Sequence, residues 1–114
     1  MKKLVLLSLL VTGTLFQYCS STKKAQSAAV SKVTYAANVQ PVIQANCSPC
    51  HIPPQGRARP LNTFDAAKAN IDETIVRIGR NPEDKGFMPM RHPKLSDSTI
   101  NVFVKWKADG LAEN

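Results

Sequence analysis

The residues of this chain best suited to chemistry form one pentapeptide, Cys47-Ser48-Pro49-Cys50-His51. Two thiols three positions apart lie about one turn of backbone from each other, so both can bond to a single flat ligand. The spacing C-x-x-C-H is the pattern of covalent c-type haem attachment, in which each cysteine forms a thioether. The histidine that follows supplies an imidazole to one face of the iron. We therefore expect one haem c, held by Cys47 and Cys50, with His51 as its proximal ligand.

Two other uses of paired cysteines fit this chain less well. A thioredoxin-like redox pair belongs to a fold that alternates strands and helices, and the sequence shows no such alternation. A zinc site needs two further ligands at a regular spacing, whereas the only spare candidates are His92 and Cys19. Haem attachment is therefore the better hypothesis.

The length and charge of the chain restrict its function. A chain of 114 residues holds one domain, whose apolar core is marginal at this size, and a covalent haem would enlarge that core. The formal net charge is +7, and removal of residues 1–18 would leave 13 basic against 8 acidic residues. This excess is spread along the chain and is not clustered with aromatic residues. It argues against nucleic-acid binding and favours attraction to acidic proteins or anionic lipid.

Residues 1–18 have the features of a signal peptide: two lysines precede an apolar run over 4–16 that is too short to be comfortable as a membrane span. The run ends just before Cys19, which stands where a bacterial lipoprotein carries its lipidated cysteine. The segment Phe16-Gln17-Tyr18 departs from the usual lipobox, and cleavage near 25–27 is the alternative. We expect lipidation at Cys19, and hence export to the periplasmic side of a bacterial membrane.

The remaining chain divides into a tether and a domain. Residues 19–33 are rich in Ser, Thr, Lys, Ala and Gln, a composition that buries little and is typical of a flexible tether. From 34 to 114 the apolar spacing is helical and no alternating strand pattern occurs, so the predicted class is all-α with about four helices. These helices are predicted at 36–46, 64–69, 71–79 and 97–109.

Polar residues at the helix starts define these boundaries. Thr63 and Ser96 are predicted N-caps, and Asn70 with Glu73 resembles a capping box. Gly110 is a predicted stop for the last helix. Four aromatic residues are predicted to lie in the core and at helix crossings: Tyr35, Phe87, Phe103 and Trp106.

Two long loops complete the domain. The first, 52–60, wraps the proximal edge of the haem site and carries Arg57 and Arg59. These arginines are candidate partners for haem propionates, because a guanidinium pairs well with a carboxylate; solvation of both is the equal alternative.

The second loop, 81–95, contains three candidate ligands for the other face of the iron: Met88, Met90 and His92. A methionine thioether is a soft donor that favours ferrous iron and raises the reduction potential relative to a second histidine. The residue types alone leave these three candidates open.

Over residues 34–112 the chain resembles a small class I cytochrome c domain. The resemblance rests on the early C-x-x-C-H, the late Met88-Pro89, and Leu95-Ser96 leading into a final helix with Trp106. It implies that the first and last helices cross and pack together. It also implies that the methionine preceding proline, here Met88, is the distal ligand.

The resemblance and the motif together predict electron transfer by a monomer that is not an enzyme. A six-coordinate haem in an apolar shell exchanges one electron without making or breaking bonds. The surplus of basic residues would guide the domain to redox partners with acidic docking surfaces, and a lipid anchor would hold it near the membrane. The alternative is a ligand sensor or peroxide-reactive haem protein with a labile sixth ligand.

Overall fold

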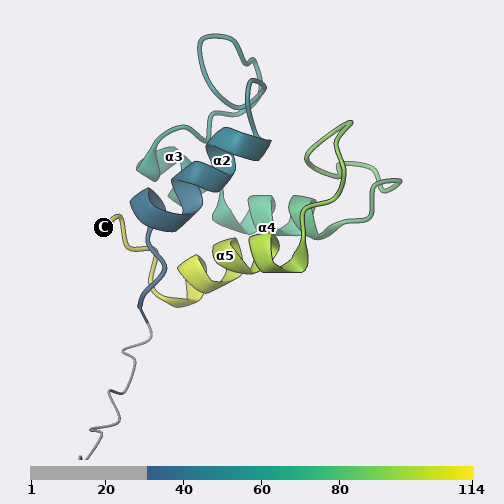
Figure 1. Ribbon diagram of the computed structural model, residues 1–114. Coiled ribbons are helices and arrows are strands. Elements are labelled where there is room, and N and C mark those ends of the chain that lie inside the picture. The colour runs from purple at the N-terminus through teal and green to yellow at the C-terminus, as the bar shows by residue number, and fades with distance from the viewer. Residues whose placement is uncertain (1–30) are drawn as a thin grey trace, which may run out of the picture.

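Helices form the regular secondary structure of residues 31–114, the part of the chain that the computed structural model describes (Figure 1). In chain order they are η1, a π-helical segment (Tyr35–Val39), α2 (Gln40–Asn46), α3 (Phe64–Ala69), α4 (Ile71–Gly79) and α5 (Asp97–Ala108). These residues contain no sheet, and one isolated parallel bridge joins Thr34 to Ala112. The predicted all-α class is confirmed, and the predicted helix boundaries are correct to within one residue. The predicted signal peptide 1–18, Cys19 and most of the tether 19–33 lie outside the described residues.

The first helix is continuous from η1 into α2, and its π-helical start accommodates a proline. The Thr34 side chain accepts a hydrogen bond from the Ala37 N–H and so begins the helix. The Gln40 N–H then donates to the Tyr35 carbonyl five residues back, which gives a wider turn than an α-helix has. Pro41 follows, with no N–H to donate and a ring that crowds the preceding turn. The wider turn gives that ring room inside the continuous helix.

The capping predictions were right at two helices and wrong at the third. Thr63 and Ser96 accept hydrogen bonds from the N–H groups of Ala66 and Thr99, as expected of N-caps. The predicted capping box of Asn70 and Glu73 is absent, because only one residue separates α3 from α4. Asn70 therefore ends α3, and its side-chain amide donates to a carbonyl of α3 at 2.7 Å instead of capping α4.

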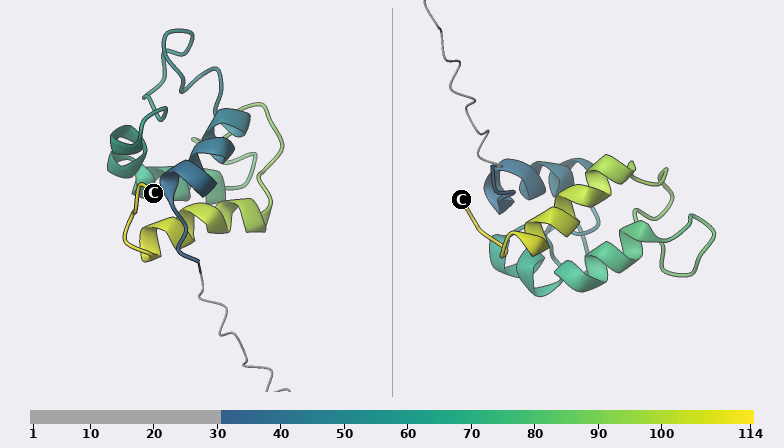
Figure 2. Two further views of the ribbon diagram at one scale, coloured as in Figure 1. Left: turned by 60° about the vertical axis from the view of Figure 1, so that its left-hand side comes forward. Right: turned by 90° about the horizontal axis from the view of Figure 1, so that it is seen from below.

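The core lies where η1 packs on α5, with α4 alongside α5 (Figures 1 and 2). Trp106 and Phe103 of α5 are completely buried, as are Val39 and Ile43 from the first helix. The rings of Tyr35, Phe64 and Trp106 contact one another, with centroids 5.8 to 6.3 Å apart. All four aromatic residues predicted to be buried are buried, although Phe87 lies outside this main cluster.

The two ends of the domain are tied together by hydrogen bonds. Gly110, at a φ of +94°, reverses the chain after α5, as predicted. The returning segment places the Ala112 carbonyl 2.9 Å from the Tyr35 N–H and 2.8 Å from the indole nitrogen of Trp106. Asp109 accepts a 2.8 Å bond from the Val33 N–H, so the last residue of the predicted tether is hydrogen-bonded to the end of α5.

Two long connections, 47–63 between α2 and α3 and 80–96 between α4 and α5, extend from this helical frame (Figure 1). Together they hold the motif cysteines and all three candidate distal ligands. Within residues 31–114, no helix has both the length and the apolar character that a bilayer crossing requires.

We expect Asp109→Asn to be less stable than the wild type at pH 7 and equally stable at low pH. The bonds from the Val33 N–H and then the Lys105 ammonium hold the pKa of Asp109 below its usual 3.8. Because the pKa is lower in the folded chain, the stabilisation is present above pH 3.8 and is lost as the pH falls through the lowered value. Urea unfolding of both proteins from about pH 7 down to about pH 2 measures this. A difference in stability that does not shrink with acidification would contradict the assignment.

Candidate functional site

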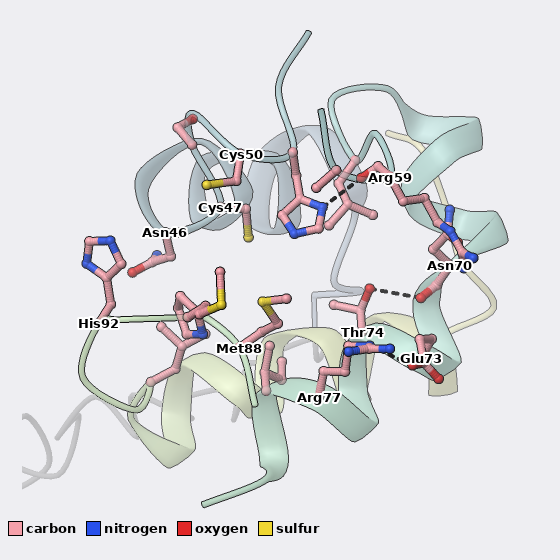
Figure 3. Close-up of a pocket in the computed structure, with 18 of the residues that line it drawn as sticks. Asn46, Cys47, Cys50, Arg59, Asn70, Glu73, Thr74, Arg77, Met88 and His92 are labelled. Carbon is pink, nitrogen blue, oxygen red and sulfur yellow. Dashed lines mark hydrogen bonds and ion pairs between the residues drawn. The ribbon is translucent and has the colours of Figure 1, made fainter. Parts of the chain in front are cut away.

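A cavity of about 600 Å³ opens between the two long connections, with α4 forming one wall (Figure 3). Its floor includes Leu61, Ile78 and Phe103, which also belong to the core. Both motif cysteines, His51 and all three candidate distal ligands line it. The structure therefore brings together, in one space, a motif and a loop that lie far apart in the sequence.

The cysteine motif forms an extra turn at the end of α2. Cys47 ends that helix through a 2.8 Å bond to the Ile43 carbonyl, and the His51 N–H donates to the Cys47 carbonyl at 3.0 Å. This bond has the spacing of a helical turn, so positions 47, 50 and 51 face the same space. Both thiols are free; Cys50 is exposed, whereas burial raises the pKa of Cys47 to about 11.

The imidazole of His51 is oriented by the loop that follows it. Its Nδ1 lies 2.6 Å from the backbone carbonyl of Arg59. A carbonyl can only accept, so Nδ1 carries a proton, and in the neutral imidazole Nε2 is then the nitrogen with the free lone pair. A histidine fixed in this way is a typical metal ligand, because the partner of one ring nitrogen sets both the tautomer and the ring plane.

The loop itself is held by backbone hydrogen bonds back to the motif. The Leu61 N–H donates to the His51 carbonyl at 3.0 Å, and the Ala58 N–H to the Cys50 carbonyl at 3.1 Å. The Arg59 side chain donates to the Asn70 side chain at 2.9 Å, which attaches the loop to the α3–α4 junction. Both candidate arginines are exposed; Arg59 is among the residues that line the cavity, and Arg57 is not.

Met88 lies across the cavity from Cys47 (Figure 3). It is partly buried and packs against the core, and its N–H donates to the Arg77 carbonyl of α4 at 3.2 Å. Met90 is 60% exposed and His92 is also exposed, although both reach the cavity lining. Of the three candidates, Met88 is the one that the surrounding protein holds in place.

A polar stripe along α4 completes the wall, and the sequence interpretation missed it. Asn70, Glu73, Thr74 and Arg77 all line the cavity, and Arg77 pairs with Glu73 at 2.6 Å. The buried isoleucines of this helix, Ile71 and Ile78, mark its core face only. The spacing i, i+3, i+4, i+7 of the polar residues defines a second face, and that signal was present in the sequence.

Among residues 31–114, no three side chains of the Asp, Glu, His or Cys type gather as a metal site would require. No family model, no curated protein and no solved structure matches the chain. The case for its function therefore rests on its residues and their geometry.

We expect Gly56→Ala to destabilise the protein by about 1–3 kcal/mol or more, since its added Cβ has no room. That carbon would overlap the backbone carbonyl oxygens of Pro49 and Cys50, where the loop passes directly over the motif. Gly79→Ala is the matched control: its Cβ meets nothing within 4 Å at the end of α4. The control should be neutral or stabilise by up to about 1 kcal/mol. Urea unfolding measures both, and a harmless Gly56→Ala would contradict the close approach.

Proposed function

We propose that this chain is an exported electron-transfer protein of the class I cytochrome c type, with one covalent haem c. Cys47 and Cys50 would hold the group through thioethers, His51 would be its proximal ligand and Met88 its distal ligand. The observation that supports this most is that an oriented histidine, His51, and a partly buried methionine, Met88, line the same cavity.

The residues of the cavity fit a haem in kind and in position. The volume lies within the range of roughly 300–1,000 Å³ that is usual for cofactor sites. Two free thiols on one turn can react with one porphyrin, and the free Nε2 of His51 can donate to iron. The apolar floor suits a porphyrin face, and the donor groups of Arg59, Asn70 and Thr74 suit its carboxylates, whereas Glu73 is already paired with Arg77.

The bound group would supply one-electron chemistry at its iron, and the chain determines the conditions. The Arg59 carbonyl keeps the proton on Nδ1 of His51 and so holds Nε2 ready to donate. The thioether of Met88 is soft and neutral, which favours the ferrous state. Leu61, Ile78 and Phe103 limit water at the floor, so the surroundings need little rearrangement when the charge changes.

Partner recognition would depend on charge. Arg59 and Arg77 line the cavity. Without residues 1–18 the chain has 13 basic against 8 acidic residues, and residues 34–114 have 10 against 8. The basic side chains would draw the protein to acidic surfaces on redox proteins through brief, salt-sensitive encounters. A lipid on Cys19 would keep it at the periplasmic side of a membrane as a tethered monomer.

The test is an absorption spectrum of the protein co-expressed with a haem-ligation system. The wild type should show low-spin c-type bands, a sulfur-to-iron charge-transfer band when oxidised, and no response to carbon monoxide when reduced. Met88→Ala should lose the charge-transfer band and bind carbon monoxide, because its iron then has an open position. Met90→Ala and His92→Ala are matched controls from the same loop and should behave as the wild type does.

Three results would contradict the proposal in different ways. A colourless protein would exclude haem attachment. A high-spin wild type that binds carbon monoxide would favour the alternative, a ligand sensor or peroxide-reactive haem protein. Loss of the charge-transfer band in Met90→Ala or His92→Ala, but not in Met88→Ala, would reassign the distal ligand.

A further inference from the structure

The loop that carries Met88 is attached to the end of α4 by basic side chains. Arg77 donates to the Gly86 carbonyl at 3.3 Å, Arg80 donates to the Lys85 carbonyl, and Lys94 donates to the Gly79 carbonyl at 3.1 Å. Within 81–95, only Phe87 and Pro89 are buried. Hydrogen bonds to α4 are therefore a large part of what holds this loop over the cavity.

Arg77 holds the loop at two points, one on either side of Phe87. Its side chain donates to the carbonyl of Gly86, and its own backbone carbonyl accepts from the Met88 N–H at 3.2 Å. The guanidinium is oriented from the other side by Glu73, whose carboxylate lies 2.6 Å from Nε. The backbone of the segment that leads into Met88 is thus fixed against a single turn of α4.

Gly86 permits this approach. Its φ of +84° is a conformation that other residues rarely adopt, and a Cβ there would press on the guanidinium groups of Arg77 and Arg80. Arginine suits the position because its planar fork can satisfy a carboxylate and a carbonyl in fixed, different directions. Lysine would offer a single flexible ammonium in its place.

We propose that Arg77 is the positioning residue for Met88, holding the methionine sulfur at the cavity through the Gly86 carbonyl and the Met88 amide. This inference rests on the proposed function, because it takes Met88 as the distal ligand. It adds a residue outside the ligand set whose replacement should loosen the sulfur and leave the haem attached.

The experiment measures carbon monoxide affinity of the reduced, haem-loaded protein, because carbon monoxide must compete with the Met88 sulfur. In Arg77→Gln the apparent affinity should rise about tenfold, the scale expected when a charge-assisted hydrogen bond is lost. Arg77→Lys should give a smaller rise, of about two- to fivefold, since it keeps the charge and loses the fork. Lys107→Gln is the control: it also removes one positive charge from an exposed ion pair, but that pair joins α5 to Asp72.

A second background separates positioning from a general loosening of the cavity. In Met88→Ala, which has no sulfur to displace, adding Arg77→Gln should leave carbon monoxide affinity unchanged. Hydrogen exchange provides a readout that does not depend on the iron: the Met88 amide should exchange faster in Arg77→Gln, while that of Leu61 on the proximal loop should not. Urea unfolding shows whether Arg77→Gln is still folded. If it is not, the same measurements are made on Arg77→Lys.

The outcomes distinguish this inference from the proposed function. A red wild type with equal carbon monoxide affinity in Arg77→Gln and Lys107→Gln would overturn the role of Arg77 and leave electron transfer intact. An equal rise whether or not the chain also carries Met88→Ala would overturn it too, because Arg77 would then act on the cavity as a whole. A colourless wild type would overturn both proposals. A rise that occurs only when Met88 is present, with faster exchange at its amide, supports the inference.

Discussion

The site depends first on the hydrogen bond between the His51 imidazole and the Arg59 carbonyl. At 2.6 Å it determines which ring nitrogen keeps a lone pair, and it does so with a backbone atom that no side-chain rotation can withdraw. In the same loop the Leu61 N–H donates to the His51 carbonyl, so a single segment holds both the ring and the backbone of His51. Gly56 allows that segment to pass close enough to the motif. The His51 side of the cavity is thus a small unit that is held together by its own hydrogen bonds.

The helical core places this unit opposite the second loop. Phe103 is shared between the core and the cavity floor, so the packing of α5 also shapes the site. Trp106, one turn further on, contacts Tyr35 at the start of the first helix, and that helix ends at the cysteine motif. The buried contact between Tyr35 and Trp106 at the start of the first helix therefore helps to fix the position of the cysteine motif at its end. A domain this small has few apolar residues, and here the same helices both bury the core and position the cavity.

Sequence patterns predicted the helices because the signals were local. Thr63 and Ser96 cap helices through bonds that span three residues, and such bonds need nothing from the rest of the chain. Asn70 carried the same kind of signal and was misread, because its side chain had two competing partners: a carbonyl of the preceding helix and the guanidinium of Arg59. Arg57 and Arg59 were indistinguishable in the sequence. Only the folded loop separates them: both are exposed, but Arg59 alone of the two lines the cavity.

The two sides of the cavity differ in how their positions are encoded. His51, the candidate proximal ligand, is oriented by a backbone carbonyl only eight residues away in the sequence. Met88, the candidate distal ligand, is held instead by α4. The Arg77 side chain donates to the Gly86 carbonyl, and the Arg77 backbone carbonyl accepts from the Met88 N–H. Side-chain bonds of this kind lose more conformational entropy on forming. The polar periodicity of α4 indicates a second face, but it does not show which loop carbonyl Arg77 reaches. The distal side is therefore the part of the site where one substitution on α4 can change the ligand geometry without disturbing the motif.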